Sequence, residues 1–186
     1  LENCFIRSGG TTRKAGRQEM GALMLNSKSP NFEELHASTL LSGQEVLNSL
    51  DYRGVSDLLG RPLPSTADEI LLWLKQQKMI KEVGEGYYIT NFGVLAAARN
   101  IHDFDGLSRK AVRLIQYDGS DKTHARKEHP GRMGYAIGFE GLIAFVDAML
   151  PHSEVIKKAL RTETSIYPEI AIRELVANAL IHQDFS

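Results

Sequence analysis

The stretch TADEILLWLKQQKMIKEVGEGYYITNFGVLAAA, residues 66–98, decides the fold of the middle of this 186-residue chain. Thr66 and Glu69 have the spacing of a capping box, in which each side chain binds the other residue's backbone N–H at a helix start. Apolar residues follow at helical spacing: Ala67, Ile70, Leu71 and Leu74. We therefore predict an amphipathic helix that begins after Thr66 and ends near Lys78.

The second half of the stretch predicts a β-hairpin and a further helix. The turn residues Gly84-Glu85-Gly86 separate two short runs of strand-forming side chains. Thr90 is expected to cap the helix that follows. The expected elements, in chain order, are helices over 44–50, 55–59 and 66–78, strands over 80–83 and 87–89, and a helix over 92–98. Helices followed by a hairpin and a helix are the order of a winged-helix module.

Two interpretations of this module are open. In a DNA-binding winged helix, the 66–78 helix enters the major groove and the hairpin forms the wing. In the alternative, the module only packs against its neighbours. Residues 66–98 contain three lysines and four acidic residues, whereas a surface that neutralises phosphates should be cationic. The charge therefore favours the packing interpretation.

The first 28 residues form a small basic segment with five cations and two acidic residues. We expect a strand over 4–7, a turn over 8–12 and a short helix over 17–25. Because a strand needs a partner, this one should pair with a strand later in the chain or with a sheet that precedes it. The cations expected to contact nucleic acid here are Arg7, Arg13, Lys14 and Arg17.

A second cationic segment lies downstream of the predicted module. Residues 111–117 are expected to form a strand, and residues 121–134 a polar loop. A cationic loop can follow a phosphate backbone, although no aromatic residue that could stack on a base lies between Asp121 and Met133. A merely solvated loop is the alternative. The basic residues of the segment are Lys122, Arg126, Lys127 and Arg132.

Two apolar helices are expected after this segment. Residues 138–150 predict a core helix that Pro151 ends, and a strand is expected over 159–166. The last helix begins near Pro168, and its apolar stripe consists of Ile172, Leu175, Val176, Ala179 and Leu180. The side chains at i, i+4 and i+8 along the edge of this stripe are Glu174, Asn178 and His182. Together they could orient water, ligate Mg²⁺ and contact phosphate. Alternatively, they could be the solvent-exposed edge of a helix whose other face is buried.

Residues 167–185, YPEIAIRELVANALIHQDF, resemble the first conserved box of GHKL-type ATPases. More narrowly, they resemble predicted transcriptional regulators related to RecG helicase. Those proteins join a Schlafen-type AlbA-like DNA-binding domain, a helical or winged-helix segment and a GHKL-like ATP-binding domain. Residues 5–15 are similar to the end of the AlbA-like domain, and residues 88–95 to the linker before the ATPase-like part. The resemblance implies that the longer parent protein binds DNA and binds ATP with Mg²⁺, and it leaves open whether the parent hydrolyses ATP.

The resemblance also implies roles for three residues. Glu174 matches the catalytic position that activates water, Asn178 matches the position that holds Mg²⁺ on the triphosphate, and His182 matches a basic, nucleotide-contacting position. The family usually has His-Arg-Asp-Tyr at the end of this box, whereas this chain has His182-Gln183-Asp184-Phe185 and lacks that cation. No Asp-x-Gly-x-Gly segment follows before Ser186, so we expect at most weak nucleotide binding and no ATPase activity from the chain by itself.

Composition bounds the remaining functions. The 22 Lys and Arg residues nearly balance the 23 Asp and Glu residues, which excludes a general polycation. The single cysteine, Cys4, excludes an intrachain disulfide and any zinc site with two thiolates, so a reducing, cytoplasmic setting is expected. No apolar run approaches the ~20 residues of a membrane helix, and no signal peptide is recognised. The start at Leu1, without a methionine, indicates a piece of a longer protein.

We expect a mixed α+β fold in three parts. These are the tail of an AlbA-like domain over 1–28, a helical, winged-helix-like segment over 29–100, and the N-terminal part of a GHKL-like ATPase sandwich over 101–186. The first hypothesis is a piece of a cytoplasmic DNA-binding regulator with an ATP site. The second is a non-enzymatic scaffold or dimerisation domain with a degenerate ATPase fold, and self-association into a homo-oligomer is open. A serine or cysteine hydrolase is disfavoured, because the Gly-x-Ser-x-Gly motif is absent.

Overall fold

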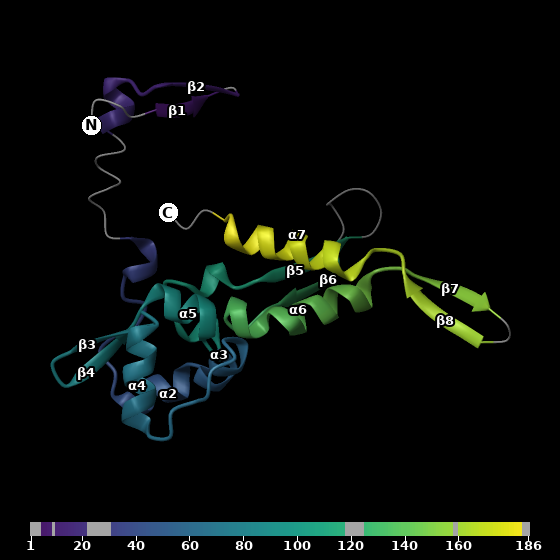
Figure 1. The fold of residues 1–186 in the computed structure, drawn as a ribbon. Helices are drawn as coiled ribbons and strands as arrows, with labels where there is room; N and C mark the ends of the chain where they lie inside the picture. Colours follow the sequence, from purple (N-terminus) through teal and green to yellow (C-terminus); the bar gives the residue numbers. More distant parts are fainter. Residues whose placement is uncertain (1–4, 9, 22–30, 118–124, 158–159, 184–186) are drawn as a thin grey trace.

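The computed structural model describes residues 5–8, 10–21, 31–117, 125–157 and 160–183. Within them, helices alternate with two-stranded antiparallel sheets (Figure 1), so the expected mixed α+β class is confirmed. The helices are α2 (Gly43–Ser49), α3 (Tyr52–Leu58), α4 (Ala67–Gln76), α5 (Asn91–Ala97), α6 (Tyr135–Met149) and α7 (Glu169–Ile181), with short 3₁₀ turns at Phe32–Glu34, Ile101–Asp103 and Ser108–Lys110. The strands are β1 (Phe5–Ser8), β2 (Thr11–Lys14), β3 (Ile80–Val83), β4 (Gly86–Ile89), β5 (Arg113–Tyr117), β6 (Ala125–Pro130), β7 (His152–Lys157) and β8 (Leu160–Ser165).

The central module, residues 31–111, contains the elements that the 66–98 stretch predicts. The capping box at Thr66 and Glu69 is formed in both directions, and a second one joins Ser42 and Glu45 at the start of α2. Strands β3 and β4 form the expected hairpin, but Gly86 pairs with Val83 as the first residue of β4, so the turn is Gly84-Glu85. The Thr90 side chain caps α5 as expected. The side chains at the centre of the shared core are fully buried: Val46, Leu50, Leu74, Ile80, Ile89 and Val94.

An extended segment over residues 36–41 runs along the free edge of β4. The Ala37 N–H donates to the Ile89 carbonyl at 2.8 Å, and Leu41 and Tyr87 exchange two backbone hydrogen bonds at 2.9 and 2.8 Å. The His36 ring stacks on the Tyr88 ring with 4.2 Å between their centroids. The hairpin therefore has a third, strand-like neighbour that the sequence pattern does not reveal.

The core of the central module extends past residue 100. Ile101, Phe104 and Leu107 are buried in it, and Tyr135 and Ile137 from the first turn of α6 pack against it. Gly134 approaches α5 so closely that a Cβ there would lie 2.6 Å from the Ala97 nitrogen. The start of α6 is therefore packed directly on the central module.

The second half of α6 packs antiparallel to α7 (Figure 1). Ile143 of α6 and Ile172 of α7 are buried. The expected core helix over 138–150 begins three residues earlier, at Tyr135, and the rest of its apolar surface is only partly covered. The apolar stripe of α7 is likewise covered in part, because Leu175 is 72% exposed.

Two expectations about strands are wrong, and one strand was not expected. The partner of β1 is the adjacent β2, because Gly10 adopts a positive φ of 84° and the chain reverses there, so Thr11 and Thr12 are strand and not turn residues. The polar loop expected over 121–134 contains β6, which pairs with β5 over Ala125–Pro130. Strand β7, which pairs with β8, was not expected. Of the helix expected over 17–25, residues 17–21 are helical and the rest lie outside the described residues.

Candidate functional site

Helix α7 begins where the sequence predicts. Pro168 precedes its first residue, Glu169, and the Pro168 carbonyl accepts the Ala171 N–H at 2.9 Å. Proline has no N–H to leave unpaired, and an acidic residue in the first turn interacts favourably with the positive end of the helix dipole. These local features fix where the turns of α7 begin and hence which side chains share an edge.

Arg173 attaches α7 to α6. Its guanidinium donates two hydrogen bonds to the Glu140 carboxylate, at 2.7 and 2.6 Å, and lies 3.7 Å from a Glu169 oxygen. It also lies over the Phe139 ring, 5.3 Å from the centroid. The hydrogen bonds from Arg173 lower the pKa of the Glu140 carboxyl below its usual value. The i, i+4 spacing of Glu169 and Arg173 is visible in the sequence, but the partner 33 residues away is not.

Glu174, Asn178 and His182 lie along one edge of α7, as their spacing predicts. All three side chains are exposed, and among the described residues none of them has a hydrogen bond or an ion pair through its side chain. His182 is the residue just after the helix, and its backbone N–H donates to the Asn178 carbonyl at 3.0 Å. The edge is therefore accessible to a ligand but is not enclosed by the described part of the chain.

The donor set on this edge fits a Mg²⁺ ion that is shared with a nucleotide. The Asn178 amide supplies a hard oxygen donor, which Mg²⁺ prefers, and the Glu174 carboxylate one turn earlier could orient water. In the described part of the chain, no group of three or more His, Cys, Asp or Glu side chains could hold a metal ion. Triphosphate and water would therefore have to supply most of the ligands.

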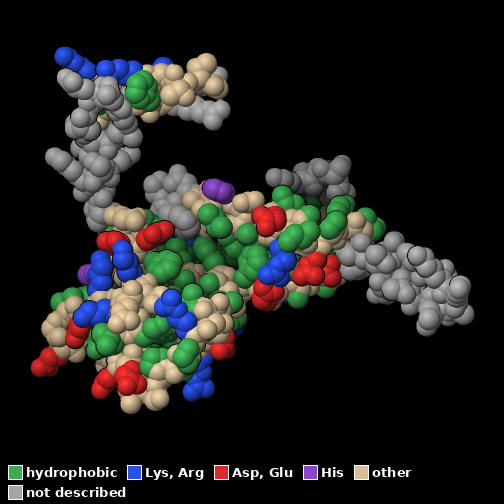
Figure 2. Space-filling view, in the orientation of Figure 1, with side chains coloured by type: hydrophobic (Ala, Val, Ile, Leu, Met, Phe, Trp, Pro, Cys, Tyr) green, Lys and Arg blue, Asp and Glu red, His purple; other side chains and the backbone are tan. Residues whose placement is uncertain are grey.

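The three lysines of the 66–98 stretch have partners within the central module. We call Lys75, Lys78 and Lys81 the lysine cluster. The Lys75 ammonium lies 2.6 Å from the Glu82 carboxylate, and that of Lys81 donates to the Glu34 carbonyl at 2.7 Å. Lys78 lies 4.0 Å from the Glu34 carboxylate. On the face shown in Figure 2, blue and red side chains are interspersed over the central module and form no single basic patch.

The N-terminal cations differ in their surroundings. Arg13 in β2 donates two hydrogen bonds to Glu19, at 3.0 and 2.6 Å, and this interaction raises the pKa of Arg13 and lowers that of Glu19. Lys14 and Arg17 are exposed. Arg7 lies in β1 opposite Thr12, and the placement of its side chain is not described.

Two of the downstream cations, Arg126 and Lys127, belong to strand β6 instead of a loop. Lys127 lies opposite Gln116 of β5, next to a shift in the register of the two strands, and the placement of the Arg126 side chain is not described. Lys127 is exposed, while Lys122 lies outside the described residues. Arg113 of β5 pairs with Glu128 at 3.0 Å, which reduces the positive charge next to Lys127.

No family model, curated protein or solved structure matches this chain. No helix of the described residues is long and apolar enough to cross a bilayer.

Proposed function

We propose that the chain is part of a cytoplasmic DNA-binding transcriptional regulator of the RecG-helicase-related type, in which a winged-helix module is joined to a GHKL-like ATP-binding module. The cytoplasmic assignment rests on the single cysteine. The order α2, α3, α4, β3, β4 supports the winged-helix part, together with the extended segment over 36–41 beside the hairpin. In this proposal β1 and β2 are the end of the preceding AlbA-like domain.

Helix α6 is the observation that carries the proposal. It has 15 residues and is therefore about 22 Å long. Its first turn packs into the core of the central module through Tyr135 and Ile137, and its second half holds α7 through Glu140 and Ile143. A change in the position of α7 would therefore act on the central module through one continuous helix, as a nucleotide-dependent regulator requires.

The proposed ATP site is the exposed edge of α7. Asn178 would hold Mg²⁺ on the triphosphate through its amide oxygen, and Glu174, one turn earlier, would orient the attacking water. His182, at the end of the helix, would contact the nucleotide. Gln183 stands where the family usually has an arginine, so nucleotide binding to this chain should be weak.

DNA contact is proposed for cations outside the central module. Lys14 and Arg17 are exposed near the N-terminal hairpin, and Lys127 is exposed on β6. Arg7, Arg13, Lys122 and Arg126 complete the proposed nucleic-acid contacts. Such contacts neutralise phosphates and carry little sequence information, so binding should be sequence-tolerant and fall steeply with salt.

One observation favours the alternative of a non-enzymatic scaffold or dimerisation domain. The lysine cluster is partnered by Glu34 and Glu82, so these three lysines are less available to neutralise DNA phosphates. The polar edge of α7 would then be a solvated helix face, and Ile170, Leu175 and Ile181 around it are exposed apolar residues that a second copy could cover.

Calorimetric titration with Mg-ATP separates the two candidates. Asn178→Ala should abolish the weak binding of the chain, while Glu174→Gln, nearly isosteric, should leave it unchanged and lower any hydrolysis. Asn48→Ala, which alters an exposed asparagine on the distant α2, is the matched control. If Asn178→Ala binds Mg-ATP as tightly as the unmodified chain, the scaffold replaces the ATP-binding regulator.

A further inference from the structure

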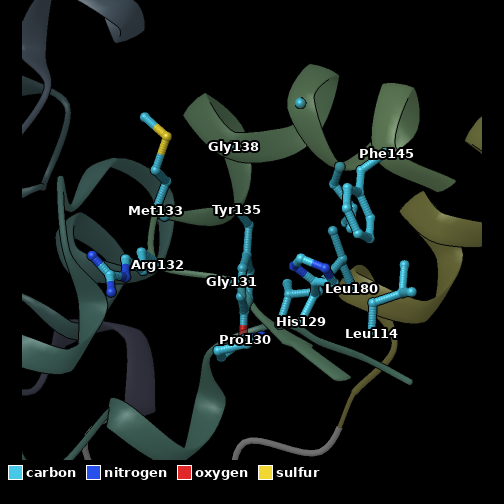
Figure 3. Close-up of a pocket in the computed structure, with 14 residues that line it drawn as sticks. Leu114, His129, Pro130, Gly131, Arg132, Met133, Tyr135, Gly138, Phe145 and Leu180 are labelled. Atoms are coloured by element: carbon cyan, nitrogen blue, oxygen red, sulfur yellow. The ribbon is translucent and has the colours of Figure 1, made fainter. Parts of the chain in front are cut away.

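A cavity of about 270 Å³ lies between the β5–β6 sheet, α6 and the end of α7 (Figure 3). Its walls are mostly apolar, and the side chains that shape it are Leu114, His129, Tyr135, Leu142, Phe145 and Leu180. A dry apolar cavity of about 150 Å³ accommodates benzene, so this one has room for a larger aromatic molecule. It lies apart from the exposed edge of α7 on which the proposed ATP site rests.

The floor of the cavity is held in place by the central module. The Gly134 N–H donates to the Ala98 carbonyl of the module at 2.8 Å, and the Gly131 N–H donates at 2.6 Å to the carbonyl of Val112, the residue that follows the module. Between them, the Arg132 carbonyl accepts the Ile101 N–H at 2.6 Å. The Tyr135 hydroxyl donates to the Lys110 carbonyl, so its ring is fixed as one wall. The cavity is thus preformed, as small-molecule sites usually are.

Gly141 leaves the wall formed by α6 open. A Cβ at this position would meet no atom within 4 Å, so no packing contact requires a glycine here. A glycine in the interior of a helix costs about 1 kcal/mol relative to alanine. The missing side chain keeps space free that a larger residue would fill.

His129 is the polar side chain that the cavity offers to a ligand, and it lies where the cavity opens to solvent, because it is exposed. Its ring makes an edge contact with Phe145, with 4.3 Å between the centroids and 60° between the planes. In Figure 3 its nitrogens lie on the side that faces Tyr135, whereas the Arg132 side chain points away from this aromatic group. No Asp or Glu is among the residues that line the cavity. A ligand anion near His129 therefore meets no carboxylate of the wall.

We propose that this cavity binds a small aromatic carboxylate. The aromatic ring system lies between Tyr135 and Phe145, whose rings favour offset or edge contacts with it. The carboxylate accepts a hydrogen bond from the His129 imidazole. The ligand touches Leu180 of α7 and also the floor of the cavity, which the central module holds in place. It therefore stabilises one arrangement of α7 relative to the central module, as an effector does.

Ligand-observed NMR and calorimetry with 2-naphthoate test the proposal on the whole chain. From about 0.3 kcal/mol per non-hydrogen atom we expect a Kd of about 1 mM or tighter and a single site. Gly141→Leu and Leu114→Trp fill the cavity from opposite walls, and each should weaken binding at least roughly tenfold. Ala148→Leu, an exposed alanine of the same helix outside the cavity, is the matched control and should bind normally.

The role of His129 is tested with a neutral probe. His129→Phe should weaken 2-naphthoate binding roughly tenfold, because a hydrogen bond to a charged group is lost. The same variant should bind 2-naphthalenemethanol as the unmodified chain does. Asn178→Ala should leave both probes unaffected, so a failure of the ATP proposal is distinguishable from a failure here.

Three results would overturn the inference. The first is the absence of saturable 2-naphthoate binding, which would mean that the cavity is either filled by a protein side chain or left empty. The second is normal binding to both filling variants. The third is an equal loss of both probes in His129→Phe, which would overturn the carboxylate assignment.

Discussion

Thr90 connects α5 to the corner between α4 and β3, and its hydroxyl is the sharpest test of how the central module is held together. The side chain is fully buried. Its oxygen accepts the Gly93 N–H at 3.0 Å as the cap of α5, and its hydroxyl lies 2.9 and 3.0 Å from the carbonyls of Lys78 and Met79. Thr90→Val keeps the shape and removes these bonds. Because the Gly93 N–H is buried and water cannot replace the cap, we expect a loss of about 2 kcal/mol, the upper end for helix caps.

Urea unfolding followed by Trp73 fluorescence measures this loss. Trp73 is the only tryptophan and packs against the central core, so its signal reports this module. Thr66→Val removes the same type of cap from α4 at an exposed position and should cost only about 0.5–1 kcal/mol, since water can bind the freed N–H. Thr90→Ser, which keeps the hydroxyl, should retain most of the stability. If Thr90→Val costs no more than Thr66→Val, the reasoning from burial is refuted.

Three further predictions concern the same module. The pKa values of the Glu45 and Glu69 carboxyls are lowered by hydrogen bonds from the backbone N–H groups that they cap. The two carboxylates therefore stabilise the fold above the pKa of Glu in the unfolded chain, about 4.3, and this stabilisation is lost as the pH falls below that value. The urea midpoint should therefore drop between about pH 5 and about pH 3. It should drop less in the Glu45→Gln, Glu69→Gln double variant, and an equal drop in the two proteins would contradict this cause. Gly93→Ala should lower the free energy of unfolding by about 3 kcal/mol or prevent folding, because a Cβ there would lie 2.2 Å from the Met79 carbonyl oxygen. A urea midpoint equal to that of the unmodified chain would exclude this clash. Replacing the lysine cluster by alanine should change the slope of log K against log salt for duplex DNA by less than one unit in a fluorescence anisotropy titration, whereas a change of about three units would mean that all three lysines contact phosphate.

The elements that sequence reasoning predicted correctly have short-range causes. The capping box at Thr66 and Glu69, the cap at Thr90 and the Gly84 turn each act within four residues along the chain. Gly84 has a positive φ of 60°, which glycine adopts without strain. Because these interactions join residues that are close in the sequence, their spacing located α4, the hairpin and α5 before any tertiary contact was known.

The errors have long-range or subtle causes. Residues 121–134 look like a loop because they are polar, yet the pairing of β6 with β5 supplies backbone hydrogen bonds that need no apolar side chains. The turn at Gly10 was placed too broadly, so the adjacent partner of β1 was missed. Arg173 was not singled out, because its main partner Glu140 is on another helix.

The candidate site divides in the same way. The alignment of Glu174, Asn178 and His182 follows from helical spacing and needs only the start of α7. Their exposure does not follow from spacing, since it depends on what packs against α7. The cavity beside Leu180 has no local signature at all, because its lining residues come from segments that are far apart in the chain.

The sequence by itself determined where the helices of the central module begin, where its hairpin turns, and which polar side chains share an edge of α7. Caps, turns and helical periodicity are interactions between residues a few positions apart, so the chain order alone specifies them. Only the tertiary structure decided that α6 belongs to both the central core and the α7 contact, that the lysine cluster is partnered, and that a preformed cavity lies between β5–β6, α6 and α7. These features depend on burial and on pairs of groups brought together across long stretches of chain, and the free energy of such contacts exists only once the whole set is packed.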